Sequence, residues 1–171
     1  MINKKICMLG AFSVGKTSLV SQFVHSVFSD KYLSTVGVKI SKKEVVVSGT
    51  EVTLLLWDME GKDVYVDINS SYLRGAMGFF VVADGSRKET LAIALELREL
   101  AFNILGVRVP TRLLINKADA TEEWEITQEA LEDLREKNIE FFCTSAKNGQ
   151  NVNIAFESLA EEMLREQNSA K

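Results

Sequence analysis

Gly10-Ala11-Phe12-Ser13-Val14-Gly15-Lys16-Thr17, which follows the apolar run Ile6-Cys7-Met8-Leu9, matches in full the pattern of a phosphate-binding loop. Its glycines let consecutive backbone N–H groups curl around phosphate oxygens. Lys16 is expected to reach the β- and γ-phosphates, and the Thr17 hydroxyl to bind Mg²⁺. The alternative is a glycine turn with an unrelated lysine. The apolar strand before the loop and the helical spacing of apolar residues from Leu19 onward favour phosphate binding.

Length and composition limit the classes of protein to which this chain can belong. The 171 residues, 46% of them apolar, suit a single domain over residues 1–171 with a sizeable core. A net charge of −4 without a basic cluster predicts no nucleic-acid partner. Cys7 and Cys143 lie in strand-like apolar runs and are expected to be buried thiols of a reducing compartment, which favours a cytoplasmic location. His25, the only histidine, is expected to be a solvated helix residue, which disfavours a histidine-based triad.

Membrane attachment is not expected from this chain. It has no apolar run long enough to span a bilayer, and its polar start lacks the apolar core of a secretory signal. Position 2 is not glycine and the last five residues contain no cysteine, so the sequence encodes no myristoyl or prenyl membrane anchor.

Strand and helix signals alternate along the whole chain, which predicts an α/β fold. We expect a doubly wound, mostly parallel six-stranded sheet with about five helices, and one antiparallel edge strand from a hairpin at 48–50. The predicted strands are Ile6–Leu9, Val38–Val47, Val52–Trp57, Phe79–Ala83, Arg112–Ile115 and Glu140–Cys143, and the predicted helices include Lys16–His25, Glu89–Leu105, Thr127–Lys137 and Asn151–Glu166. Ligands of such sheets bind at the carboxyl ends of the strands.

Two further motifs follow strands, and they point to a guanine base. Asn116-Lys117-Ala118-Asp119 comes directly after a predicted strand. The Asp119 carboxylate can accept hydrogen bonds from the guanine N1–H and exocyclic amine, but it would face an acceptor at adenine N1. Ser145-Ala146-Lys147 follows the last predicted strand, where a backbone N–H can meet the guanine O6. Each motif alone is weak, but their order behind a phosphate loop is specific.

From about residue 3 to 165 the chain resembles the small GTPases of the Ras superfamily, nearest to the Rab-like branch. The resemblance implies a Mg²⁺-dependent GTP/GDP switch that hydrolyses GTP and meets effector and regulator proteins, among them an exchange factor and a GTPase-activating protein, at two switch loops. It assigns nucleotide binding to Gly10, Ser13, Val14, Gly15, Lys16, Thr17, Ser18, Phe28, Tyr32, Thr35, Gly61, Asn116, Lys117, Asp119, Ser145, Ala146 and Lys147. It assigns metal binding to Thr17, Thr35 and Asp58, and catalysis to Lys16, Thr35, Gly61 and Lys62.

Several of these residues have ordinary structural explanations as well. The resemblance implies that Phe28 packs against the base, that Thr35 binds Mg²⁺ only when the γ-phosphate is present, and that the Gly61 N–H meets that phosphate. Residues of the same types also serve as a core phenylalanine (Phe28), a loop threonine (Thr35), a strand-end turn former (Asp58) and solvated lysines (Lys62 and Lys147).

The second switch departs from the family pattern. Lys62 stands where a glutamine normally orients the attacking water, and an ammonium group has no acceptor for that water's hydrogen. Glu60 stands where a small residue is usual, with repulsion, an outward rotamer or a salt bridge to Lys62 as its options. Phe12 adds bulk where the arginine of an activating protein would enter. These changes predict slow hydrolysis with intact binding, and they leave open a GTP-binding scaffold with negligible turnover. Asp119 argues against a third candidate, an adenine-dependent phosphotransferase.

Overall fold

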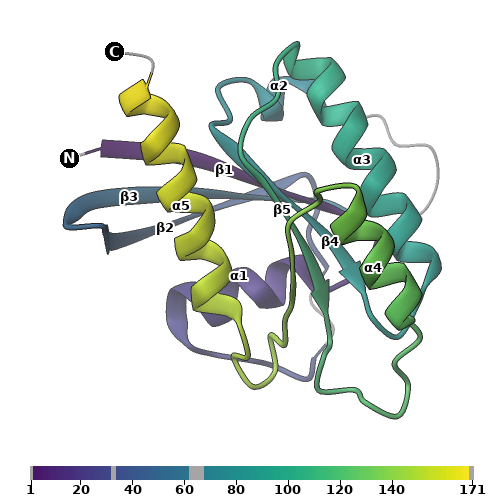
Figure 1. Ribbon diagram of the computed structural model, residues 1–171. Coiled ribbons are helices and arrows are strands. Elements are labelled where there is room, and N and C mark those ends of the chain that lie inside the picture. Colours follow the sequence, from purple (N-terminus) through teal and green to yellow (C-terminus); the bar gives the residue numbers. More distant parts are fainter. Residues whose placement is uncertain (1, 32–33, 62–67, 170–171) are drawn as a thin grey trace.

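A computed structural model describes residues 2–31, 34–61 and 68–169 (Figure 1). Its six strands form one sheet in the order β2-β3-β1-β4-β5-β6, with β2 antiparallel to β3 and every other pair parallel. The expected α/β fold with one antiparallel edge strand is confirmed. The described elements are β1 (Ile2–Gly10), α1 (Lys16–His25), β2 (Val38–Val47), β3 (Thr50–Met59), α2 (Ser70–Leu73), β4 (Gly78–Asp84), α3 (Glu89–Leu105), β5 (Thr111–Asn116), α4 (Gln128–Glu136), β6 (Phe141–Cys143) and α5 (Val152–Ser169).

β1 and α2 differ most from the sequence prediction, and the ends of the other elements lie within three residues of their predicted positions. β1 begins at Ile2, four residues early, because Lys4 lies fully buried in it and donates to Met163 O at 3.1 Å and Gln167 Oε1 at 2.7 Å. Burial lowers the pKa of the Lys4 ammonium. Helix α2 has four residues, too few to show a period in sequence, and begins where the Asn69 side chain accepts a hydrogen bond from the Ser71 N–H.

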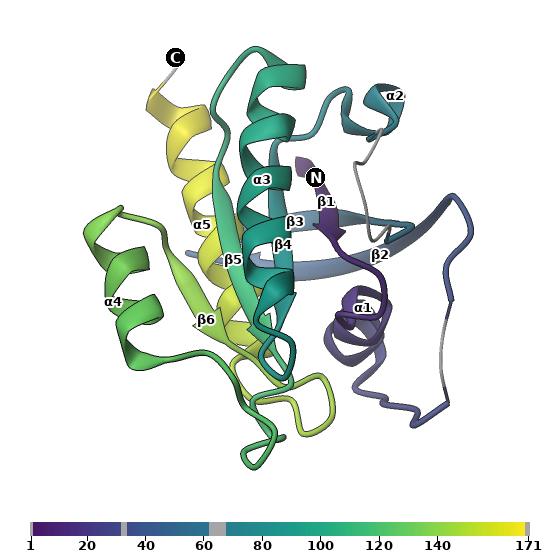
Figure 2. The same ribbon diagram turned by 90° about the vertical axis from the view of Figure 1, so that its right-hand side faces the viewer.

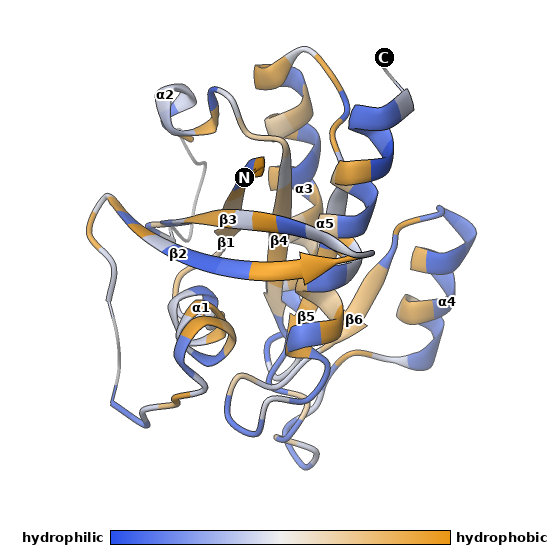
Figure 3. Ribbon diagram, turned by 90° about the vertical axis from the view of Figure 1, so that its left-hand side faces the viewer, coloured by the Kyte–Doolittle hydropathy of each residue, from blue (hydrophilic) through white to orange (hydrophobic). Residues whose placement is uncertain are grey.

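The hairpin between β2 and β3 forms as expected. Ser48 and Gly49 both adopt left-handed conformations, with φ of 49° and 76°. Two such residues make the tight turn whose twist matches that of the flanking strands. β2 lies at the sheet edge, and Figure 3 shows its change from hydrophilic residues to a hydrophobic end. The lysines in its hydrophilic part disfavour pairing of that edge with another strand.

The helices cover both faces of the sheet (Figure 2). α1 and α5 pack on one face, where Phe23 and Phe156 stack with ring centroids 4.0 Å apart. α3 and α4 pack on the other. Alternate residues of β4 face the two layers, Phe80 toward the first and Phe79 toward the second, so this strand is buried throughout.

This topology brings the predicted motifs to one edge of the sheet. β1, β3, β4, β5 and β6 run parallel, so the loops after them open at the same side. Asp58 pairs in register with Met8, and Asn116 with Asp84.

The remaining expectations concern single residues. His25 is exposed, as predicted. Cys7 and Cys143 are both free thiols. Cys7 is buried, and burial raises the pKa of its thiol to about 12. Cys143, expected to be buried, is half-buried because β6 is an edge strand. No helix within the described ranges has the length and apolarity needed to cross a membrane.

Candidate functional site

A cavity of about 240 Å³ lies at the carboxyl edge of the sheet. Five predicted segments meet there: the phosphate loop, the two switches and the two base-reading loops. The predicted residues that line it are Ser13, Gly15, Lys16, Thr17, Ser18, Phe28, Thr35, Gly61, Asn116, Lys117, Asp119, Ala146 and Lys147. Gly10, Val14, Asp58 and Ser145 are buried behind this lining. Tyr32 and Lys62 lie outside the described residues.

The phosphate loop presents a helix N-terminus to the cavity. Gly15, with φ of 103°, precedes α1 and supplies no side-chain cap, so the first N–H groups of the helix face the cavity as an anion site would require. The Lys16 ammonium is buried over the loop and donates to Gly10 O and Ala11 O, each at 2.9 Å. Its positive charge therefore lies where phosphate oxygens would be held.

The second switch begins against this lysine. A Cβ at Gly61 would lie 2.5 Å from Lys16 Nζ and 2.6 Å from Ala11 O. Glycine is thus required here by close approach to the phosphate loop, and its backbone lies within reach of whatever Lys16 binds.

Three oxygen-bearing side chains meet beside the phosphate loop. Thr17 Oγ1 lies 2.6 Å from Thr35 Oγ1, and it donates to Asp58 Oδ2 at 2.6 Å. Burial raises the pKa of the Asp58 carboxyl, against the hydrogen bond from Thr17 and the nearby charge of Lys16. Asp58 Oδ1 is buried without a hydrogen-bond partner. Two hydroxyls and one carboxylate, one oxygen of which is unsatisfied, form a donor set that fits a hard cation such as Mg²⁺.

Asn116 joins the phosphate loop to the base-reading loops. Its amide nitrogen donates to Val14 O at 3.1 Å. Its amide oxygen accepts from Thr144 Oγ1 at 3.3 Å and from the Ala146 N–H at 3.2 Å. A guanine O6 would meet the Ala146 N–H only by sharing or replacing that last bond.

Asp119 is held in place by the partner loop. Ser145 Oγ donates to Asp119 Oδ1 at 2.6 Å, and the same hydroxyl accepts from the Asn148 N–H at 3.2 Å. The carboxylate is exposed at the cavity wall. One of its oxygens is thus anchored, as a carboxylate that reads two adjacent donors requires.

Lys117 has a partner that our sequence analysis missed. Its ammonium pairs with Asp84 Oδ2 at 2.7 Å, and it adopts a left-handed backbone with φ of 69°. Asp84 is the last residue of β4 and is almost fully buried. The rule that located the other motifs, polar residues at carboxyl ends of parallel strands, also applies to Asp84. The segment Ser29–Lys31 and Ser34 also line the cavity without having been predicted.

The departures from the family pattern have definite positions. The Glu60 carboxylate turns to the first switch, where Oε2 accepts from the Gly37 N–H at 3.3 Å, and the Glu60 N–H donates to Gly37 O at 2.9 Å. The Glu60 side chain is therefore directed to the other switch. The salt bridge to Lys62, another of its options, concerns a residue outside the described ranges. The Phe12 ring lines the cavity and is 42% exposed. Phe28 also lines the cavity, partly buried against the core.

Comparison with known proteins gives a family and close relatives. The model of the Ras family matches residues 5–165. Ras-related protein Rab-13 of Canis lupus familiaris is 34% identical over 161 residues, which cover 94% of this chain and 79% of the relative. Ras-related protein Rab-25 of Homo sapiens is 31% identical over 161 residues, which cover 94% of this chain and 76% of the relative. The matched region contains every loop of the cavity.

Proposed function

This chain belongs to the Ras family, whose members are GTP-binding switches, and from that premise we propose that it is a Mg²⁺-dependent GTPase with slow turnover. The observation that supports this most directly is that a phosphate loop, Thr35, Gly61 and two base-reading loops line one cavity. On this proposal residues 1–171 act as one nucleotide-binding domain.

The nucleotide is bound at its two ends by different loops. Lys16 and the N-terminus of α1 neutralise the β- and γ-phosphates. Asp119, oriented by Ser145, accepts hydrogen bonds from the guanine base and rejects adenine. Lys147 lays its stem along the base, Lys117 belongs to the base-reading motif with Asn116 and Asp119, and Phe28 packs edge-on against the base. Tyr32 belongs to the same binding set by family resemblance.

Thr17 and Thr35 would hold Mg²⁺, with Asp58 acting through water. The bound ion would neutralise charge on the phosphate oxygens. The side chains of Thr17, Thr35 and Asp58 already contact one another, and Asp58 Oδ1 has no hydrogen-bond partner among the described residues. Thr35 belongs to the first switch and Gly61 to the second. Because the contacts of both residues depend on the γ-phosphate, both switch loops respond to its presence. Effectors and regulators then distinguish the GTP and GDP states by these loops.

Slow turnover follows from the second switch. Phosphoryl transfer depends on positioning and electrostatics. Lys16 stabilises developing charge, and Thr35 and Gly61 position the γ-phosphate. Lys62 has the charge to assist but no acceptor to orient the attacking water. The second candidate, a GTP-binding scaffold with negligible turnover, is favoured by this residue and by the tie between Glu60 and Gly37.

Two measurements on the purified chain test the proposal. The nucleotide released on denaturation should be GDP or GTP, and Lys16→Ala or Thr17→Ala should weaken its binding and its Mg²⁺ dependence. Single-turnover hydrolysis of preloaded GTP should be measurable but slower than that of a relative with glutamine after the switch glycine. A rate indistinguishable from that of GTP free in buffer would favour the scaffold. Equal affinity for ATP and GTP would overturn both candidates, the slow GTPase and the GTP-binding scaffold.

A further inference from the structure

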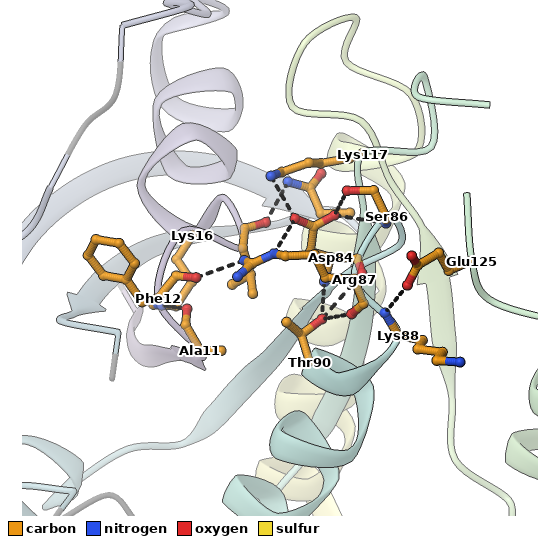
Figure 4. A network of polar contacts seen from close by, with 12 residues as sticks. Ala11, Phe12, Lys16, Asp84, Ser86, Arg87, Lys88, Thr90, Lys117 and Glu125 are labelled. Atoms are coloured by element: carbon orange, nitrogen blue, oxygen red, sulfur yellow. Dashed lines mark hydrogen bonds and ion pairs between the residues drawn. The ribbon is translucent and has the colours of Figure 1, made fainter. Parts of the chain in front are cut away.

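A chain of charged contacts runs behind the cavity, from the phosphate loop to the base-reading loop (Figure 4). At its centre is Asp84, whose side chain is 1% exposed. Asp84 Oδ2 accepts from Lys117 Nζ at 2.7 Å and from Arg87 Nε at 3.0 Å. Asp84 Oδ1 accepts from the Ser86 hydroxyl at 2.6 Å and the Ser86 N–H at 2.9 Å. Every oxygen of this buried carboxylate is therefore engaged.

Arg87 extends the chain to the phosphate loop. Its Nη2 donates to the backbone oxygen of Phe12 at 2.8 Å, while its Nε holds Asp84. One guanidinium thus joins a strand end to the loop that binds phosphate. The planar group suits this task because it presents donors in two fixed directions, which a lysine ammonium does not.

The turn that carries Arg87 is itself fixed. The Thr90 hydroxyl accepts from the Asp84 N–H at 2.8 Å and donates to Arg87 O at 2.7 Å. The neighbouring Lys88 N–H donates to Glu125 Oε2 at 2.9 Å. Because its backbone is held at several points, the Arg87 side chain reaches the phosphate loop from a rigid base.

We propose that Arg87 and Asp84 are positioning residues that tie the phosphate loop to the base-reading loop and thereby slow nucleotide release. The inference rests on the proposed function, since it assumes that the cavity holds a guanine nucleotide. Neither residue lines the cavity, so they act through Phe12 and Lys117, which do. A nucleotide gripped at its phosphates by one loop and at its base by the other leaves more slowly when the two loops cannot move apart.

The test is the dissociation rate of a fluorescent GDP analogue from the full chain in excess unlabelled GDP. Arg87→Gln removes both charge-assisted bonds and should speed release about tenfold. Arg87→Lys keeps the charge beside Asp84 but not the two-way geometry, and should give an intermediate rate. Arg98→Gln is the matched control, since Arg98 also lies on the α3 side and pairs with Glu99, away from the cavity. It should release GDP at the parental rate.

Two further readouts separate positioning from general destabilisation. Asp84→Asn combined with Arg87→Gln should release GDP little faster than Asp84→Asn alone, because both act through one chain of contacts. Arg87→Gln should lower the unfolding midpoint of the nucleotide-free protein more than Arg98→Gln, because it takes a partner from a buried carboxylate. The release rates are therefore compared at a temperature at which the parent and both variants are fully folded. If the unsubstituted protein retains GDP and Arg87→Gln releases it at the same rate, the positioning role of Arg87 and Asp84 is wrong. A parent that retains no guanine nucleotide would instead overturn the proposed function, and this inference with it.

Discussion

The side-chain amide of Asn116 occupies the space that a Cβ at Gly15 would need: the Asn116 nitrogen lies 2.2 Å from that position. The same nitrogen donates to Val14 O at 3.1 Å, across 102 residues of sequence. The glycine at position 15 is therefore required by the asparagine at position 116. A side chain at position 15 would displace the Asn116 amide and break its hydrogen bond to Val14 O, which couples the two halves of the cavity.

Gly15→Ala should weaken GDP binding at least about tenfold, because it combines a left-handed backbone that costs about 1–3 kcal/mol with the clash against Asn116. Gly49→Ala is a matched control, since Gly49 also has positive φ but open space around it. It should lower stability by a similar strain and leave GDP binding unchanged. Isothermal titration and urea unfolding measure the two effects. Equal loss of affinity in both variants would contradict the role assigned to Asn116.

Asp119→Asn should lower GTP affinity at least about a hundredfold and shift preference toward xanthine nucleotides, because an acceptor is replaced by a mixed donor and acceptor. Ser145→Ala, which leaves the carboxylate but removes the 2.6 Å hydrogen bond that orients it, should weaken GTP binding less and keep guanine preference. Competition between GTP, XTP and ATP measures both. Retained preference for GTP over XTP in Asp119→Asn would show that another group reads the base.

Glu60→Ala with Lys62→Gln should raise the single-turnover rate of GTP hydrolysis at least about tenfold, because a side-chain amide can orient the attacking water. GTP affinity should change by less than about threefold, since the gain is in the transition state. The same substitution types at the exposed Glu44 and Lys42 pair on β2 serve as control and should leave the rate unchanged. An unaltered rate in the switch variant would mean that this protein positions its water through another group.

Asp84 should contribute to stability in a pH-dependent way. Burial raises the pKa of its carboxyl, but the hydrogen bonds from Lys117, Ser86 and Arg87 outweigh that effect and hold the pKa below the ordinary 3.8. A depressed pKa in the folded state means that the stabilisation is complete above pH 3.8 and is lost as pH falls through the lower value.

The gap in unfolding free energy between parent and Asp84→Asn should therefore be constant from about pH 7 to 5 and should narrow below about pH 4. Urea unfolding across this range measures it. Asp133→Asn, which breaks an exposed pair with Lys137, should show little gap at any pH. A gap for Asp84→Asn that persists at the lowest pH would mean that the ion pairs are not its source.

The sequence by itself determined the features that depend on local pattern. The phosphate loop, the base-reading motifs that begin at Asn116 and Ser145, and the hairpin at Ser48-Gly49 each occupy a few consecutive residues. Their chemistry is readable because the backbone conformation they need is set by those residues themselves. Parallel strands then bring their carboxyl ends to one edge, so the meeting of the loops could be predicted as well.

Only the tertiary structure decided which side chains connect those loops. Arg87 reaching Phe12, Asp84 holding Lys117, and Glu60 holding the Gly37 N–H join segments far apart in the chain. No local period or motif marks such contacts, because they depend on the register of β4 against β5 and on the path of each loop. From the sequence alone, an arginine such as Arg87 that follows a strand is expected to be solvated. It connects two loops only because folding places the Asp84 carboxylate at its Nε and the Phe12 carbonyl at its Nη2.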